Sequence, residues 1–328
     1  LPSKLKLWPK ITRLLRTEKC QIYITGSSAQ MLSKEIATQM RGRALAWEMF
    51  PYSFAEYLDA LEISAEGPMS SKKRLTLEKA FESYWNTGGF PETARVSDAL
   101  RVRIHQEYFQ AIHYRDLLER HDIPHPRALR DLAHYLIDNA ASLYSLNSLY
   151  GHLKALGHKL TRSCVSQYVE WMEDAYFLFS VRLYDASFSR SNANPKKIYC
   201  IDHAMIRSIS SGVLTNSGHL LENLVFSTLR RKHAEIFYYR TASGKEVDFV
   251  TEGRGPGKSP LLVQACESLA QEKTRRREVQ ALQEAMRELG VRESLLVCRR
   301  DSETIQTDDG EIRVIPVWRL MWDYSKHD

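Results

Sequence analysis

The chain has 328 residues, enough for two or three domains, with 43% hydrophobic and 26% charged residues and a formal net charge of +6. These proportions are typical of a soluble globular protein, and no apolar run approaches the roughly 20 residues of a membrane helix. The mild positive charge permits a nucleic-acid partner without requiring one. The five cysteines are widely spaced and form no Cys-x-x-Cys pair, which excludes a disulfide framework or zinc site and favours a reducing, cytoplasmic compartment.

The first segment is basic and poor in acidic residues, as transit peptides are, but it lacks their richness in Ser and Arg. We therefore expect an ordinary helix over residues 1–17. A short apolar strand is predicted from Ile22 to Ile24, and the turn Thr25-Gly26-Ser27-Ser28 follows it. Small polar residues at the end of a buried strand suit the ligand crevice of an α/β fold.

Residues 35–58, "EIATQMRGRALAWEMFPYSFAEYL", carry a more specific pattern. This pattern consists of the Gly42-Arg43 pair and the Phe-Pro-Tyr-Ser-Phe run at 50–54, and the Gly26-Ser27-Ser28 turn precedes it. It resembles the prokaryotic AAA-type ATPases of the AAA+ superfamily that carry a C-terminal domain of unknown function. The resemblance implies nucleotide-sensing residues, which would be Ser27, Ser28, Arg41 and Arg43. A guanidinium group can bind a phosphate through two hydrogen bonds. The alternative is that both arginines cap or solvate a helix.

Such ATPases carry a phosphate loop and an acidic metal-binding strand ahead of this segment, and neither motif is present here. The run "GRGPGKS" at 253–259 is a false match, because Glu252 stands where the first Gly of the motif should be. It also lies between two predicted strands, so we expect a hairpin loop and no ATP site. The resemblance thus implies ATP and Mg²⁺ as cofactors of the intact family member and none for this chain. We interpret the chain as a fragment, a truncated member, or a protein whose first part was lost.

Two helices are predicted in the middle of the chain, over residues 71–87 and 105–123. The first ends at Gly88-Gly89 and a Pro91 turn, which is a typical helix stop. Both stretches resemble the same ATPase family. We interpret residues 61–126 as a helical connector.

Residues 127–202 are predicted to form a winged helix-turn-helix. Apolar residues at helical spacing predict a helix that Gly157 ends, and Thr161 is placed to cap the next helix. Strands are predicted over 176–184 and 196–202. Two helices joined by a short turn and followed by a β-hairpin define this motif.

The second helix of this motif would enter the major groove of DNA. Its outward residues that could contact DNA are Arg162, Ser163, Ser166 and Gln167, whereas Glu170 would repel a phosphate. Between Arg127 and Arg190 seven basic residues face six acidic ones, so the strong basic footprint of a duplex binder is absent. The sequence is compatible with a duplex DNA partner, with a protein partner and with an oligomer. No membrane partner is expected.

The last third, residues 203–328, is predicted to follow the order α-β-β-β-α-β. The helices are expected over 218–232 and 272–290, and the strands over 235–240, 246–250, 261–266 and 294–298, with a further strand over 312–318. This order resembles the PD-(D/E)xK nucleases, whose fold is that of restriction endonucleases. That family holds Mg²⁺ with carboxylates from a helix and two strands, and a Lys orients the attacking water.

Matching the family motif residue by residue assigns Glu222 to the helix position and Asp248 to the strand position. Gln264 falls where the second strand carboxylate should be, and Cys266 falls where the Lys should be. Glu222, Asp248 and Gln264 are therefore the candidate catalytic residues, with Glu222 and Asp248 as candidate metal ligands. Because a charge and an ammonium group are missing from this pattern, we expect a degenerate site without turnover.

The sequence as a whole predicts an α/β and α+β multidomain protein. Its parts are the end of a P-loop ATPase core (residues 1–60), the helical connector, the winged helix-turn-helix and the nuclease-like domain. We favour a DNA-associated or protein-docking member of the AAA family. The alternative is an enzyme, either an ATPase in the intact protein or a metal-dependent DNA nuclease with a variant active site.

Overall fold

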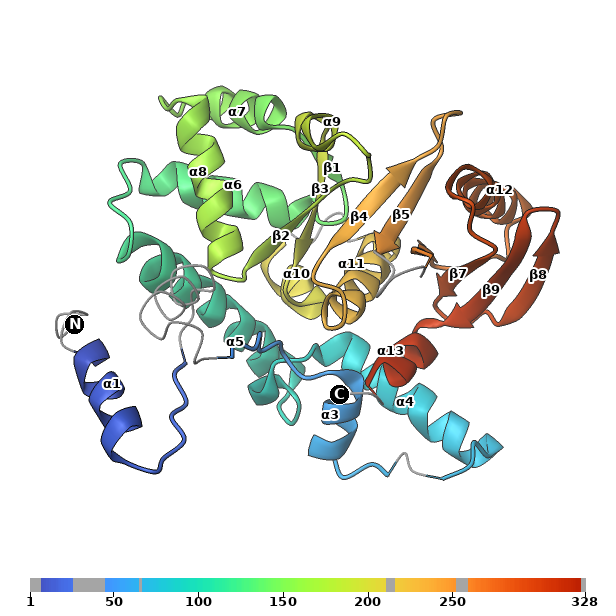
Figure 1. Cartoon of the computed structure of the whole chain (residues 1–328), viewed down its shortest axis with the longest axis horizontal. Coiled ribbons are helices and arrows are strands. Elements are labelled where there is room, and N and C mark those ends of the chain that lie inside the picture. Colours follow the sequence, from blue (N-terminus) through green and yellow to red (C-terminus); the bar gives the residue numbers. More distant parts are fainter. Residues whose placement is uncertain (1–6, 26–44, 65–66, 211–215, 252–258, 326–328) are drawn as a thin grey trace.

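The computed structural model describes residues 7–25, 45–64, 67–210, 216–251 and 259–325. Its centre is a nine-stranded mixed sheet in the order β1-β3-β2-β4-β5-β6-β7-β9-β8, with helices packed around it (Figure 1). This agrees with the predicted α/β class. Over the described ranges, no helix combines the length and the apolar character that crossing a membrane demands.

The N-terminal segment departs from the prediction at one point. Helix α1 (Leu7–Thr17) forms as expected. Residues 22–24 do not form a strand, and the Tyr23 side chain is 84% exposed. A strand needs a neighbour for its backbone hydrogen bonds, and no described strand pairs with this segment. The nucleotide-sensing candidates Ser27, Ser28, Arg41 and Arg43 lie outside the described residues.

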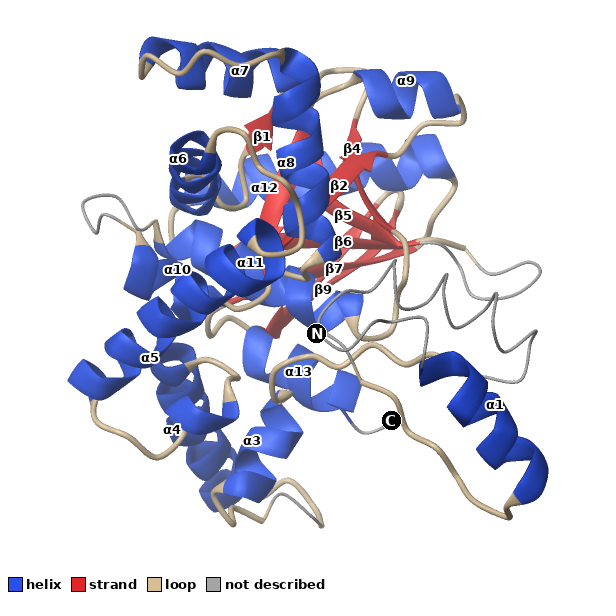
Figure 2. Ribbon diagram, turned by 90° about the vertical axis from the view of Figure 1, so that its left-hand side faces the viewer, coloured by secondary structure: helices blue, strands red, loops and turns tan. Residues whose placement is uncertain are grey.

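The predicted connector is helical. It consists of α3 (Phe54–Ala60), α4 (Ser71–Thr87), the short 3₁₀ turn η2 (Pro91–Thr93), α5 (Asp98–Ala111) and its π-helical continuation η3 (Ile112–Leu118). Figure 2 shows α3, α4 and α5 gathered below the strands. The Gly88-Gly89 turn joins this layer to the rest, because the Asp202 carboxylate accepts a hydrogen bond from the Gly89 N–H at 2.7 Å. Gly88 has φ = 75°, and a Cβ there would lie 2.5 Å from Asp202 Oδ1, so only glycine fits this contact.

The next segment contains the helices and strands expected at 146–200. Its elements are α6 (Pro126–Asp138), β1 (Leu143–Tyr144), α7 (Leu146–Ala155), α8 (Arg162–Asp174), β2 (Leu178–Leu183), α9 (Phe188–Ala193), β3 (Lys196–Cys200) and α10 (His203–Ile209). Thr161 caps α8 as predicted, since its side chain accepts a hydrogen bond from the Cys164 N–H. Strand β3 pairs antiparallel with both β1 and β2.

The predicted α-β-β-β-α-β order of the last third is present. Its elements are α11 (Ser217–Arg230), β4 (Ile236–Arg240), β5 (Glu246–Thr251), β6 (Leu261–Cys266), α12 (Glu272–Leu289), β7 (Glu293–Cys298), β8 (Glu303–Thr307), β9 (Gly310–Pro316) and α13 (Val317–Ser325). The final predicted strand ends at Pro316, and α13 follows it. Strands β5 and β6 pair antiparallel, as the predicted hairpin requires, and the glycine-rich residues 252–258 between them lie outside the described residues.

The sheet continues across the boundary predicted at residues 202 and 203. Strand β2 pairs in parallel with β4 through Arg182 opposite Phe237 and Leu183 opposite Tyr238. Helices α11 and α13 contribute to one apolar core, and α12 contributes to a second core with residues of β5, β6, β7 and β9. This arrangement places β3 against α11, which carries Glu222, and the Lys197 side chain of β3 reaches Asp248 on β5.

Candidate functional site

A buried cluster of charges lies where the sequence predicted the nuclease-like centre. Glu222 on α11 and Asp248 on β5 are 8% and 6% exposed, and the ammonium group of Lys197 lies between them. Lys197 Nζ is 2.8 Å from Glu222 Oε1, from Asp248 Oδ1 and from Glu246 Oε1. The Tyr199 hydroxyl donates a further hydrogen bond of 2.7 Å to Glu222 Oε1. We call these residues (Lys197, Tyr199, Glu222, Glu246 and Asp248) the closed cluster.

Strand β3 places the Lys197 side chain at the cluster because side chains alternate between the two sides of a strand. Residues two apart on a strand point to the same side, so Lys197 and Tyr199 reach the carboxylates together. Asn223 on α11 fixes this register, because its amide accepts from the Cys200 N–H at 2.8 Å and donates to the Cys200 carbonyl at 3.0 Å. The Tyr199 ring stacks on Phe226 with 4.4 Å between ring centroids. The cluster is thus fixed by both polar and aromatic contacts.

Burial and the neighbouring charges set the protonation of this cluster. Burial raises the pKa of the Glu222 carboxyl to about 8, and the Asp248 carboxylate adds to the rise, while Lys197 opposes it. Burial alone would lower the pKa of Lys197, but the surrounding carboxylates raise it well above its ordinary value. Lys197 therefore keeps its charge at neutral pH, and the Glu222 carboxyl binds a proton more readily than an ordinary carboxyl group does.

Gln264 connects the closed cluster to α12. Its amide oxygen accepts from the Asp248 N–H at 3.1 Å, and its amide nitrogen donates to Glu278 Oε2 at 2.8 Å. Arg277 then donates to Glu278 Oε1 at 2.9 Å. Burial raises the pKa of Glu278 and Arg277 lowers it. Glu278 is a buried carboxylate next to the predicted site that sequence matching missed, because it comes from the helix after the motif strand.

The Mg²⁺ ion that a nuclease-like centre implies does not fit these residues. A hard cation needs free, negatively charged oxygen atoms. Asp248 Oδ1 already accepts from Lys197, and Asp248 Oδ2 accepts from the Ala265 N–H at 2.9 Å. Glu222 Oε1 accepts from both Lys197 and Tyr199. In the part of the chain that the structure describes, no group of three His, Cys, Asp or Glu side chains is arranged to hold a metal ion.

The prediction that this centre lacks an ammonium group is wrong, because Lys197 supplies one from outside the sequence motif. Cys266, which stands at the motif position of the Lys, instead lies opposite Cys298 on the adjacent strand. The signal for Lys197 was available in the sequence. A lysine inside the apolar strand "KKIYC" at 196–200 needs a buried partner of opposite charge. The sequence could not identify that partner, which lies on elements that follow much later in the chain.

The predicted DNA-contact residues share one face of α8. Arg162, Ser163 and Gln167 are exposed, and Ser166 is half-buried. The opposite face of α8 is buried in the core through Val165, Tyr168, Val169 and Met172. The Arg162 guanidinium lies over the Tyr150 ring of α7, 5.5 Å from its centroid. The structure therefore brings these four residues together on the surface, apart from the closed cluster.

Three family models match the chain. Residues 4–58 match a model described as an AAA domain, residues 78–214 match a domain of unknown function (DUF8612), and residues 217–320 match a second domain of unknown function (DUF4143). The match at the N-terminus and the C-terminal domain of unknown function support a relationship to the AAA-type ATPases.

Two curated relatives are similar over most of the chain. An uncharacterized protein of Methanocaldococcus jannaschii is 33% identical over 327 residues, which cover 97% of this chain and 72% of that protein. An uncharacterized protein of Haemophilus influenzae is 28% identical over 247 residues, which cover 74% of this chain and 59% of that protein. The chain belongs to the same family as the M. jannaschii protein. No solved structure matches it.

Proposed function

We propose that this chain is the DNA-binding portion of an AAA-family ATP-binding protein and that its nuclease-like domain does not cleave DNA. The observation that carries the proposal is the exposed polar face of α8 beside the β2–β3 hairpin. ATP binding and hydrolysis belong, in this proposal, to the intact family member. Its nucleotide-sensing residues would be Ser27, Ser28, Arg41 and Arg43.

The order of elements supports a winged helix. Helices α6, α7 and α8 are followed by β2 and β3, and β1 pairs with β3, so three helices lie beside a small antiparallel sheet. The N-terminal residues of a recognition helix contact base edges, and Arg162 and Ser163 begin α8. The segment between β2 and β3, which contains α9, would form the wing, and its Phe188 and Arg190 are exposed.

The closed cluster supports the absence of cleavage. A PD-(D/E)xK centre needs a metal ion on its carboxylates and a cation near the attacking water. Here one ammonium group neutralises the carboxylates directly, so it competes with the metal ion instead of assisting it. The domain would thus retain the nuclease-like frame without its chemistry.

Fluorescence anisotropy with a labelled duplex tests the proposal. We expect salt-sensitive binding with a shallow slope of log K against log salt, since each neutralised phosphate contributes about −0.9 and few contacts are available. Arg162→Ala should weaken binding roughly fivefold or more. Arg319→Ala, an exposed arginine of α13, is the matched control and should have no effect.

Two outcomes would contradict the proposal. Unchanged affinity in Arg162→Ala would remove α8 from the DNA site and favour a protein partner for the winged helix. Nicking of plasmid DNA with Mg²⁺ or Mn²⁺, abolished by Asp248→Ala, would make the chain a metal-dependent nuclease with a variant site.

A further inference from the structure

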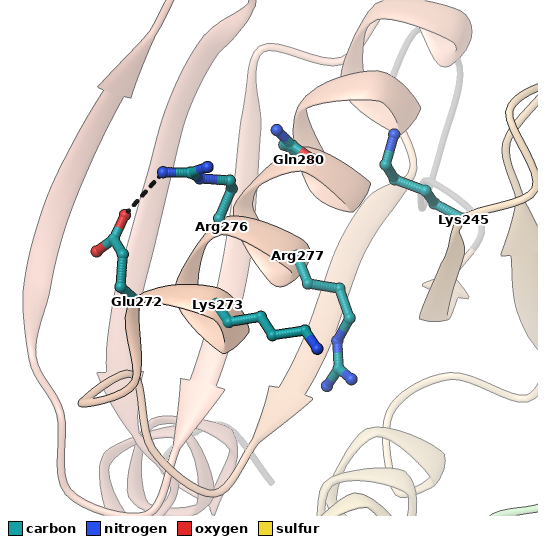
Figure 3. Close-up of a pocket in the computed structure, with 6 residues that line it drawn as sticks. All are labelled: Lys245, Glu272, Lys273, Arg276, Arg277 and Gln280. Atoms are coloured by element: carbon teal, nitrogen blue, oxygen red, sulfur yellow. Dashed lines mark ion pairs between the residues drawn. The ribbon is translucent and has the colours of Figure 1, made fainter.

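A second cluster of charged side chains lies on the outside of α12. It forms an open pocket of about 410 Å³, lined by Lys245, Glu272, Lys273, Arg276, Arg277 and Gln280. Four cations and one carboxylate line the pocket, and two of the cations are also paired with carboxylates of α12, Lys245 with Glu284 and Arg277 with Glu278. Figure 3 shows Arg276 directed toward Glu272, whereas Lys273 and Arg277 extend away from that pair. We call these residues the α12 pocket.

The helical repeat places the pocket residues on one stripe. Lys273, Arg276, Arg277 and Gln280 are three or four positions apart, so their side chains share a face of α12. The buried residues of α12 (Glu278, Ala281, Leu282, Ala285 and Met286) anchor the helix to the rest of the molecule. Lys245 joins the stripe from the turn between β4 and β5, where it forms an ion pair with Glu284 of α12. Helix α12 and the turn between β4 and β5 therefore both contribute cations to the α12 pocket.

The ion pairs of the pocket leave the charge of Lys273 available, and that of Arg276 only weakly neutralised. Arg276 lies 3.7 Å from Glu272, and both side chains are largely exposed, so solvent weakens that attraction. No ion pair or hydrogen bond of the Lys273 ammonium is found among the described residues. Lys273 and Arg277 are also one helical turn apart, and like charges at this spacing destabilise a helix. An anion bound between them would remove this repulsion.

The α12 pocket is next to the closed cluster. The chain of contacts Arg277–Glu278–Gln264–Asp248 joins the two within the same unit. In Figure 1, α12 and α8 lie over opposite halves of the sheet. A ligand in the α12 pocket is therefore separate from one on the face of α8.

We propose that the α12 pocket binds phosphate groups of a nucleic-acid backbone, which gives the nuclease-like domain a DNA contact of its own. Guanidinium groups form paired hydrogen bonds to phosphate oxygens, and ammonium groups act as point charges beside them. The open form of the pocket suits a strand that passes across it. The site goes beyond the proposed function, because it requires neither Arg162 nor the wing.

The double variant Lys273→Gln/Arg276→Gln tests this site. Both side chains are exposed, so folding should be preserved. The matched control is Lys72→Gln/Lys79→Gln, which removes two exposed cations from α4. Binding of a labelled 20-nucleotide single strand and of the duplex is measured by anisotropy at several salt concentrations. We expect the pocket variant to lose about one to two units of the slope of log K against log salt, and the control to match the wild type.

Three outcomes separate the alternatives. An unchanged slope in the pocket variant would overturn the proposal, whatever Arg162→Ala does. A reduced slope in the pocket variant together with normal binding by Arg162→Ala would support the α12 pocket and contradict the winged-helix site. Displacement of the strand by micromolar pyrophosphate or mononucleotide would overturn the assignment to a nucleic-acid backbone, because it would indicate a small phosphate ligand.

Discussion

The two charge clusters of the C-terminal unit differ in how their charges are neutralised. In the closed cluster, one lysine contacts two buried carboxyl groups, Glu222 and Asp248, and the half-buried Glu246. In the α12 pocket, Lys273, Arg276 and Glu272 are exposed to the solvent. A buried charge must be paired within the protein, since desolvation without a partner is costly, whereas an exposed charge stays available to a ligand. We infer that the closed cluster is structural and the α12 pocket is a binding site.

The largest effect is expected from removing the lysine of the closed cluster. Lys197→Met leaves the buried Asp248 carboxylate without its counter-ion, and breaking a buried ion pair typically costs about 3–5 kcal/mol. Urea unfolding should show this loss, while Lys196→Met, at the preceding position of β3, should unfold close to the wild type. Equal stability of the two variants would mean that Lys197 contributes nothing to the cluster.

Glu222 should make stability depend on pH. Because its pKa is raised to about 8 in the folded protein, its contribution is fully present below its unfolded pKa and is lost as pH rises through 8. We expect the free energy of unfolding to fall by about 4 kcal/mol between pH 5 and pH 8.5, because about three units of the pKa shift lie in this range and each corresponds to about 1.4 kcal/mol. Glu222→Gln should flatten this part of the urea-stability profile. An identical profile in that variant would show that another group titrates.

A smaller loss of stability is expected from a change at the Arg277–Glu278 pair, which joins the α12 pocket to the closed cluster. Arg277→Gln leaves the Glu278 carboxylate without its cation, and Glu278 is only 4% exposed. We expect a loss of about 1–2 kcal/mol, less than for Lys197, because Arg277 itself is largely exposed. Arg276→Gln changes only the exposed pair with Glu272 and should leave the urea midpoint almost unchanged. A reversed order of the two variants would contradict the division into buried and exposed charges.

The sequence was sufficient to predict most elements and insufficient to predict their contacts. Apolar residues at helical spacing predicted α8, which buries one face, and short apolar runs predicted the largely buried strands β4 to β7. The strand at 22–24 was predicted wrongly, since three apolar residues do not reveal whether a neighbouring strand exists. Helix α13 was missed because its sequence continues the apolar pattern of β9.

The candidate site shows the same limit. Glu222, Asp248 and Gln264 were found by the spacing of a known motif, and the structure places Asp248 in contact with Gln264. Lys197 and Glu278 were missed because they reach the site through tertiary packing of β3 and α12. The sequence motif covers only residues of α11, β5 and β6. The charge balance of the buried site also depends on β3 and α12, which pack around it.

The most direct test of the account is the titration of Mn²⁺ into the wild-type chain by isothermal calorimetry at neutral pH. The account predicts no binding that depends on Asp248, since Lys197 holds the carboxylate oxygens that a metal ion would need. Submillimolar Mn²⁺ binding that disappears in Asp248→Asn would contradict it, because Lys197 would then yield its place to a metal ion.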